Sequence, residues 1–207
     1  MAILPKTQLE PSEDAPNFVL RGNRFKPLIW ETMSQQQREM TRSILCGKRA
    51  NMQGPYNVLL HSPEVGQLAQ EFGAHTRFNS SLPLAFNELA ILIVARDWTS
   101  QFVWWAHRRI AEEEGVPVDL VNAIATQSTP PVNLSKEFEA VYHFCSELIQ
   151  RRAVSDFNFE RIRTLFGERG AVDLMATLSY YTLVCMSLNV DDYPLPEGVK
   201  PELAPKA

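Results

Sequence analysis

Apolar residues recur every three or four positions along most of the chain, which is the spacing of one face of an α-helix. No stretch of strand length alternates Val, Ile or Thr with polar residues, and no Asn-Gly or Asp-Gly hairpin signal occurs. The pattern predicts helices over residues 33–47, 63–79, 83–98, 100–114, 117–127, 135–152, 155–167 and 169–188. We therefore expect an all-α fold built as a helical bundle.

Residues that favour helix ends mark several of these boundaries. Ser34 begins the sequence Ser-Gln-Gln-Gln, a capping box, and Ser135 and Ser155 stand at the starts of later helices. Pro63 suits a first helical turn, where its missing N–H is no loss. Gly167 is expected to separate the last two helices, because glycine commonly ends a helix.

Two aperiodic, proline-rich segments flank the helical region. Residues 1–29 are predicted to form an extended arm that lies on the body of the protein or on a neighbouring subunit. Residues 191–207 are predicted to form an irregular C-terminal tail. The region between them, residues 30–190, is expected to be a single helical domain, which agrees with a chain length of 207 residues.

The formal net charge of −4 argues against nucleic acid as the main partner, because neutralising phosphates needs a basic surface. The longest unbroken apolar run, residues 89–95, is far shorter than the roughly 20 residues that cross a bilayer. The first residues lack the basic end and the apolar stretch of a secretory signal. We therefore expect a cytoplasmic protein without a membrane segment.

The sequence carries no recognisable metal or cofactor motif. The histidines form no H-x-x-x-H pair, and the cysteines Cys46, Cys145 and Cys185 form no C-x-x-C pair. The glycine-rich signatures of dinucleotide and nucleotide-phosphate sites are absent as well. We expect a protein that holds no metal, needs no cofactor and buries its thiols.

Glu88 lies in the most apolar predicted helix, within the sequence LAFNELAILIVA at residues 84–95. Apolar side chains surround this helix on nearly every side, which is typical of a central helix. Burying a carboxylate is costly unless it is paired, hydrogen-bonded or protonated. Two interpretations remain: Glu88 pairs with a nearby arginine or faces a groove, or its pKa is raised and it transfers a proton.

His107 lies on the next predicted helix, in an apolar stripe with Val103, Trp104 and Ala111. A histidine in such a stripe is either a core residue with a hydrogen-bond partner or a proton-transfer group. A tight turn joins the two helices, so antiparallel packing would bring Glu88 and His107 together. One carboxylate and one imidazole in an apolar pocket would form a proton-transfer pair.

The segment ELAILIVARDWTSQFVWWAHRRIAEEEG, residues 88–115, resembles the signature of the carboxymuconolactone decarboxylase family, which includes the AhpD-like alkylhydroperoxidases. The resemblance is most specific over residues 54–127, and it implies an AhpD-like helical bundle. It matches Glu88 to the family glutamate, Arg96 and Trp98 to its R-x-W, and His107 to the histidine that ends the motif.

Two departures from the family pattern narrow what the resemblance implies. The redox branch carries C-x-x-C-x-x-x-H, but Ser100 and Val103 stand at the cysteine positions. Neither side chain forms a disulfide or a sulfenic acid, so thiol-dependent peroxide reduction at that site is excluded. The decarboxylase branch carries an acid in Y-E-W-x-x-H where this chain has Val103, which weakens the case for carboxymuconolactone itself as the substrate.

The resemblance implies a cofactor-free lyase or related proton-transfer enzyme that acts on a small organic acid or lactone, of the kind used in the breakdown of aromatic compounds. His107 would be the general acid/base, and Glu88 would set its tautomer or share its proton. Arg96 would anchor a substrate carboxylate, or else pair with a nearby acidic side chain. Trp98 and Trp104 would line the cavity, or else pack in the core.

Two alternatives belong to other classes of protein. A binding or structural protein would keep the fold without the chemistry. A peroxidase-like enzyme would have to use Cys46, Cys145 or Cys185, none of which lies in the motif.

Phe102 and Trp105 give the helix of His107 a second apolar side, opposite the histidine. A single helix pair cannot bury both sides within one small subunit. Together with the family resemblance, this pattern predicts a homo-oligomer, either a trimer or a hexamer.

Overall fold

The computed structural model describes residues 16–205, which form one all-α domain with eight α-helices and no strands. A short 3-10 helix, Trp30–Thr32, precedes them. The α-helices are α1 (Gln35–Cys46), α2 (Tyr56–Leu59), α3 (Pro63–Phe78), α4 (Leu84–Asp97), α5 (Gln101–Glu113), α6 (Val118–Thr126), α7 (Lys136–Arg151) and α8 (Asp156–Asp191). The all-α prediction is therefore confirmed.

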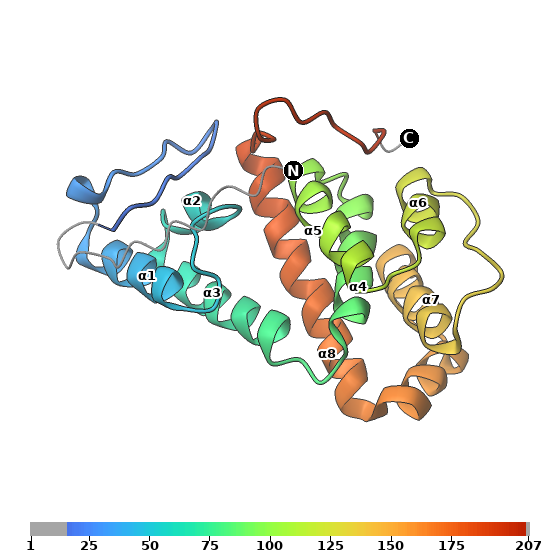
Figure 1. Ribbon diagram of the computed structural model, residues 1–207. Helices are drawn as coiled ribbons and strands as arrows, with labels where there is room; N and C mark the ends of the chain where they lie inside the picture. The colour runs from blue at the N-terminus through green and yellow to red at the C-terminus, as the bar shows by residue number, and fades with distance from the viewer. Residues whose placement is uncertain (1–15, 206–207) are drawn as a thin grey trace.

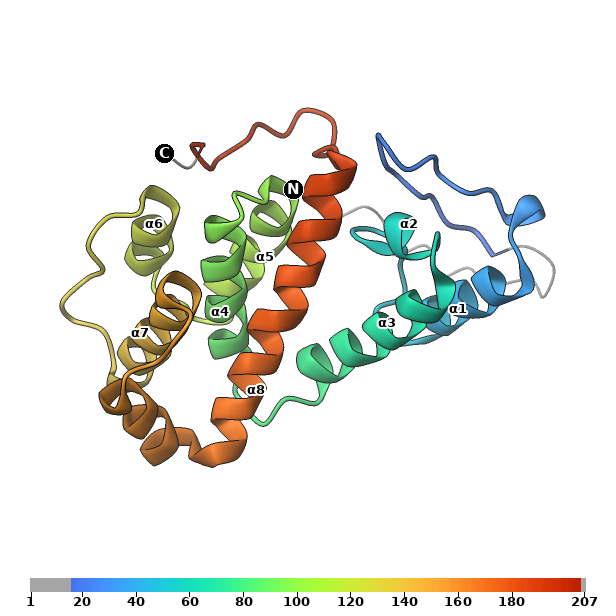
Figure 2. The same cartoon turned by 180° about the vertical axis from the view of Figure 1, so that it is seen from behind.

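Helix α8 runs between two groups of helices (Figures 1 and 2). On one side α4, α5, α6 and α7 share the larger cluster of buried apolar side chains, and α4, α5 and α7 pack against α8. On the other side, α1, α2 and α3 form a second buried cluster with the segment that precedes α1. The two clusters meet at α8, which contacts both α2 and α3.

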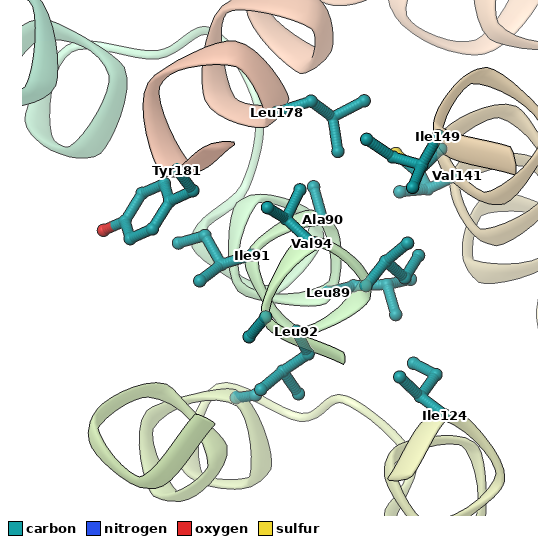
Figure 3. Close-up of a cluster of buried hydrophobic side chains, with 14 of the residues drawn as sticks. Leu89, Ala90, Ile91, Leu92, Val94, Ile124, Val141, Ile149, Leu178 and Tyr181 are labelled. Carbon is teal, nitrogen blue, oxygen red and sulfur yellow. The ribbon is translucent and has the colours of Figure 1, made fainter. Parts of the chain in front are cut away.

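Helix α4 is the centre of the larger cluster, and α5, α6, α7 and α8 all pack against it. Its residues from 87 to 96 are all buried, so no side of the helix faces solvent. Figure 3 shows Leu89, Ala90, Ile91, Leu92 and Val94 pointing outward around the helix into its neighbours. A helix enclosed on every side takes mostly apolar residues around its whole circumference, which explains the lack of a polar face in its sequence.

Most predicted helix ends are confirmed. Ser34 and Gln37 form the capping box at the start of α1, and the Ser135 and Ser155 hydroxyls accept hydrogen bonds from the backbone at the starts of α7 and α8. Pro63 is the first residue of α3. The predicted break at Gly167 is also present, with φ at +69°, although helix continues on both sides of it within α8.

Two parts of the fold differ from the prediction. The four-residue helix α2 and the 3-10 helix before α1 were not predicted, because neither is long enough to show a helical period. The last helix also extends beyond residue 188 to Asp191. The carboxylate of Asp191 is buried, and its Oδ1 accepts hydrogen bonds from the backbone N–H groups of Asn23, Arg24 and Phe25.

Both end segments lie on the helices in the part that the structure describes. Residues 16–29 contain no helix and are held at the end of α8 by Asp191. Residues 202–204 lie against α4 and α5, where the side chain of Gln101 bonds the backbone of Glu202 and Leu203. The predictions for residues 1–15 and 206–207 lie outside the described residues.

Helix α8 is long and apolar enough to cross a membrane by length and composition alone. The core helix of a globular domain has the same composition, and 56% of this apolar window is buried inside the protein. Its contacts with α3, α4 and α7 account for that burial.

Candidate active site

The turn between α4 and α5 sets the two candidate catalytic residues face to face. Thr99 adopts a left-handed conformation with φ at +48°, which is unusual for a β-branched residue. The backbone N–H of Ser100 bonds the carbonyl of Ala95, and that of Thr99 bonds the carbonyl of Arg96, which together form a Schellman motif. This compact turn returns α5 antiparallel to α4.

Glu88 and His107 meet between the two helices. Nδ1 of His107 lies 2.6 Å from Oε2 of Glu88. The Glu88 side chain has no exposed surface, whereas 8% of the His107 side chain is exposed. The other carboxylate oxygen, Oε1 of Glu88, is buried without a hydrogen-bond partner. The structure thus brings together the two residues that the sequence singled out for proton transfer.

The bond to Glu88 determines which imidazole nitrogen can react. With the carboxylate ionised, Nδ1 carries the hydrogen and donates it to Glu88, so Nε2 is left to accept or donate a proton. Tyr181 of α8 packs edge-on against the imidazole, with ring centroids 4.9 Å apart. Burial raises the pKa of the Tyr181 hydroxyl, which keeps it protonated.

Arg96 does not reach the Glu88–His107 pair. Its Nη1 donates to the carbonyl of Ala204 at 2.8 Å, and its Nη2 donates to Oε1 of Gln127 at 2.9 Å. Its Nε is buried without a partner. The guanidinium therefore ties the C-terminal segment and the end of α6 to α4, and its predicted role as a substrate anchor receives no support from this geometry.

The two predicted cavity tryptophans occupy different environments. Trp104 is fully buried in the larger cluster, and its indole N–H donates to Oε2 of Glu202 at 3.1 Å. Trp98 is half-buried at the end of α4, and its carbonyl accepts a hydrogen bond from Asn189. Neither contact involves Glu88 or His107.

The thiols lie outside the candidate site. Ser100 and Val103, at the family's cysteine positions, are both buried. Cys145 and Cys185 are buried as well, and burial raises the pKa of the Cys185 thiol to about 12. Cys46 is exposed on α1. Within residues 16–205, no group of three or more His, Cys, Asp or Glu side chains could hold a metal ion.

A surface hollow of about 970 Å³ lies elsewhere, between α7 and the first part of α8. His143, Phe157 and Arg161 are among its lining residues, and none of the residues predicted for the site lines it. Arg161 is paired with Glu139 at 2.7 Å and lies over the ring of Phe157.

Sequence reasoning missed Tyr181, which contacts His107, and its neighbour Tyr180. Aromatic residues at helical spacing are usually core residues, and both tyrosines are indeed buried. The available signal was chemical, since two adjacent tyrosine hydroxyls occur in the more apolar second half of α8. A buried tyrosine hydroxyl normally forms a hydrogen bond with a polar partner.

The comparisons with known proteins add no identification: no protein-family profile matches this chain, and no curated protein matches it.

Proposed function

We propose that the protein is an enzyme that transfers a proton at carbon in a small organic acid or lactone, with His107 as the general acid/base and Glu88 as its positioning residue. The observation that carries this proposal is the 2.6 Å contact between Nδ1 of His107 and Oε2 of the fully buried Glu88. A carboxylate held on one imidazole nitrogen fixes the tautomer and makes the other nitrogen the working atom.

A lyase reaction suits this pair. In a decarboxylation, the bond between the substrate carbon and its carboxyl group breaks, CO₂ leaves, and the electron pair stays on the substrate as a carbanion or enolate. Protonated Nε2 of His107 then donates its proton to that carbon, and solvent later returns a proton to the imidazole. The apolar surroundings of the pair would limit competing protonation by water.

The sequence resemblance supports the same class of enzyme. The proposal therefore includes an AhpD-like arrangement of the helices and a carboxymuconolactone decarboxylase-like reaction without a cofactor. Val103 in place of the acid of that family leaves the particular lactone or keto acid to be found by experiment.

A homo-oligomer, a trimer or a hexamer, is part of the proposal. Part of the second apolar side of α5 is covered within the chain, because Phe102 packs on Tyr193 with ring centroids 4.7 Å apart. Other apolar side chains stay exposed, and Val65, Leu68 and Phe72 form such a stripe on α3. Sedimentation at micromolar concentration is expected to show an oligomer, and a monomer would contradict this part.

The test is a screen of lactones and keto acids for CO₂ release and for deuterium incorporation at carbon in D₂O. With the substrate found, His107→Gln is expected to lower kcat by about 10²- to 10⁴-fold, the usual share of general acid–base catalysis. Glu88→Gln is expected to cause a similar or smaller loss. His143→Gln is the matched control, because 42% of that side chain is exposed on α7.

An unchanged kcat in folded His107→Gln would overturn the catalytic assignment.

A binding or structural protein is the second candidate. It is favoured by Arg96 and Trp104, whose polar groups hold the C-terminal segment instead of facing the pair. In that case no acid of the screen is turned over, and His107→Gln lowers only the melting temperature.

A further inference from the structure

A group of tyrosine and arginine side chains lies next to the Glu88–His107 pair, on the side of α8 that faces α2 and α3. We call Arg49, Tyr56, Tyr180 and Tyr181 the tyrosine–arginine cluster. Tyr180 can lie against α3 because Gly73 has no Cβ, which would otherwise collide with the tyrosine ring. Tyr181 follows Tyr180 directly, and their ring centroids are 5.3 Å apart.

Arg49 places a positive charge inside this cluster. Its Nη2 donates to the Tyr180 hydroxyl at 3.4 Å, and its guanidinium carbon lies 5.7 Å from the ring centroid of Tyr180 and 5.8 Å from those of Tyr56 and Phe78. Aromatic faces attract a cation, but they do not neutralise its charge. Among residues 16–205, no carboxylate forms an ion pair with Arg49.

Two hydrogen-bond donors of the cluster are buried without an acceptor. They are Nε of Arg49 and the hydroxyl of Tyr56, a residue with only 2% of its surface exposed. Burial raises the pKa of the Tyr56 hydroxyl, and the nearby Tyr180 hydroxyl adds to this increase, although the two hydroxyls are not aligned as donor and acceptor. A buried donor without a partner is costly to the fold, and such a group is explained by a bound water or ion at its position.

The cluster is connected to the candidate catalytic pair through Tyr181. The Tyr181 ring packs against Tyr180 on one side and against His107 on another. In Figure 3 its hydroxyl points away from the aliphatic side chains around α4. Burial raises the pKa of the Tyr181 hydroxyl, while Arg77 lowers it and Glu88 raises it further, so a second arginine and the Glu88 carboxylate both act on this hydroxyl.

We propose that the tyrosine–arginine cluster binds the carboxylate of a small organic acid, with Nε of Arg49 and the hydroxyl of Tyr56 as its donors. A carboxylate supplies the acceptors that both donors lack and the negative charge that Arg49 lacks. Tyr180 and Tyr181 would flank the rest of the molecule and direct it toward Nε2 of His107. This last step depends on the proposed function, whereas binding of the carboxylate does not.

The charge of Arg49 also indicates which carboxylate the cluster would hold. A guanidinium that binds the group to be lost as CO₂ would stabilise the starting acid more than the transition state, in which that charge moves away. The cluster therefore suits a carboxylate that the reaction leaves in place.

Calorimetric titration with benzoate tests the binding site, because benzoate combines a carboxylate with a flat ring that suits the aromatic walls. We expect wild type to bind benzoate, and Arg49→Gln to weaken binding by about 10- to 100-fold, which corresponds to the loss of a charge-assisted hydrogen bond. Arg109→Gln is the matched control, since 64% of that side chain is exposed on α5. Stronger binding of inorganic phosphate than of benzoate would overturn the assignment to a carboxylate.

Tyr56→Phe separates binding from folding. It removes a buried hydroxyl that has no partner, so the ligand-free variant should be at least as stable as wild type, while benzoate binding should weaken several-fold. A Tyr56→Phe variant that loses stability but binds benzoate as tightly as wild type would show a structural role and contradict the proposal.

His107→Gln distinguishes this inference from the proposed function. The variant should bind benzoate within about twofold of wild type, because it keeps both donors. If no acid is turned over but benzoate binding depends on Arg49, the proposed function fails and the binding site stands. If turnover is found and Arg49→Gln changes neither KM nor benzoate binding, the binding site fails and the proposed function stands.

Discussion

Oε2 of Glu88 lies 2.6 Å from Nδ1 of His107, while Oε1 of the same carboxylate has no partner. Within residues 16–205, the fully buried Glu88 carboxylate thus has His107 as its one hydrogen-bond partner. Removing one member of a buried pair typically costs about 3–5 kcal/mol, whereas replacing both with apolar residues costs far less. His107→Leu should therefore lower the free energy of unfolding strongly, and adding Glu88→Leu should restore much of the loss.

Urea denaturation of wild type, both single variants and the double variant measures this coupling. The exposed pair Arg109–Glu113, at 2.9 Å, is the control, because surface pairs are worth about 0–1 kcal/mol. A double variant whose loss equals the sum of the two single losses would mean that Glu88 and His107 are energetically independent.

The fold was predictable where a helix has one buried face. Helices α3, α5 and α7 show the apolar period, and the serines before α1, α7 and α8 accept the hydrogen bonds expected of caps. The end of α8 was not predictable, because Asp191 is held by backbone groups of the arm more than 160 positions earlier in the chain. Local sequence carries no signal for such a contact.

The Glu88–His107 contact was predictable because the two residues lie on consecutive helices joined by a compact turn. The residues that surround this pair were not predictable. Tyr181 comes from α8, and the partners of Arg96 come from the end of α6 and the C-terminal segment. A sequence motif shows which residue types occur, but a side chain such as arginine is long enough to point in several directions from the same backbone.

Arg96→Lys tests whether Arg96 holds the fold or the substrate. A lysine cannot reproduce two contacts in different directions, so we expect the free energy of unfolding to fall by about 1.5–3 kcal/mol, with KM unchanged. Thermal melts measure the stability of the variant, and steady-state kinetics on the same preparation measure its KM. A rise in KM without loss of stability would instead support the substrate anchor that the family resemblance implies.

Cysteine reactivity should follow burial. Cys46 is exposed, while Cys145 and Cys185 are buried with raised thiol pKa values, so an aromatic disulfide reagent should modify one thiol in the native protein and all three after denaturation. Modification of Cys46 should leave any activity within a few-fold of the untreated enzyme. Inactivation in step with its modification would contradict a thiol-free mechanism.

Asp191 should stabilise the arm. Its Oδ1 accepts backbone hydrogen bonds at 2.7 Å from Phe25 and 2.9 Å from Arg24. Asp191→Asn keeps an acceptor oxygen but removes the charge that strengthens these bonds, so it should lower the free energy of unfolding by about 2 kcal/mol. Limited proteolysis should also cut the arm faster in this variant. Asp192→Asn, whose side chain is exposed next to it, is the control. Equal effects of the two substitutions would mean that the bonds to Asp191 contribute nothing specific.

The stability of the protein should depend on pH through Glu147, which lies at the connection between α7 and α8. Its Oε2 accepts hydrogen bonds from the Asn158 amide at 2.8 Å, from the Ser155 hydroxyl at 2.9 Å and from the Ser155 backbone at 3.0 Å. These bonds, led by that of Asn158, lower the pKa of Glu147 from 4.5 to about 2. Because the folded-state pKa is the lower one, the carboxylate stabilises the fold fully above pH 4.5, and this contribution is lost as the pH falls toward 2.

Glu147→Gln should therefore destabilise the protein at neutral pH, because Gln keeps the shape but removes the charge that strengthens these hydrogen bonds. The difference in unfolding free energy between wild type and variant should shrink steadily below pH 4.5, down to the lowest pH at which both remain folded. Glu160→Gln is the control, because Glu160 forms an exposed pair with Arg163 within one turn of α8. A difference that stays constant across the acid range would show that Glu147 acts through its shape, and the proton linkage would be wrong.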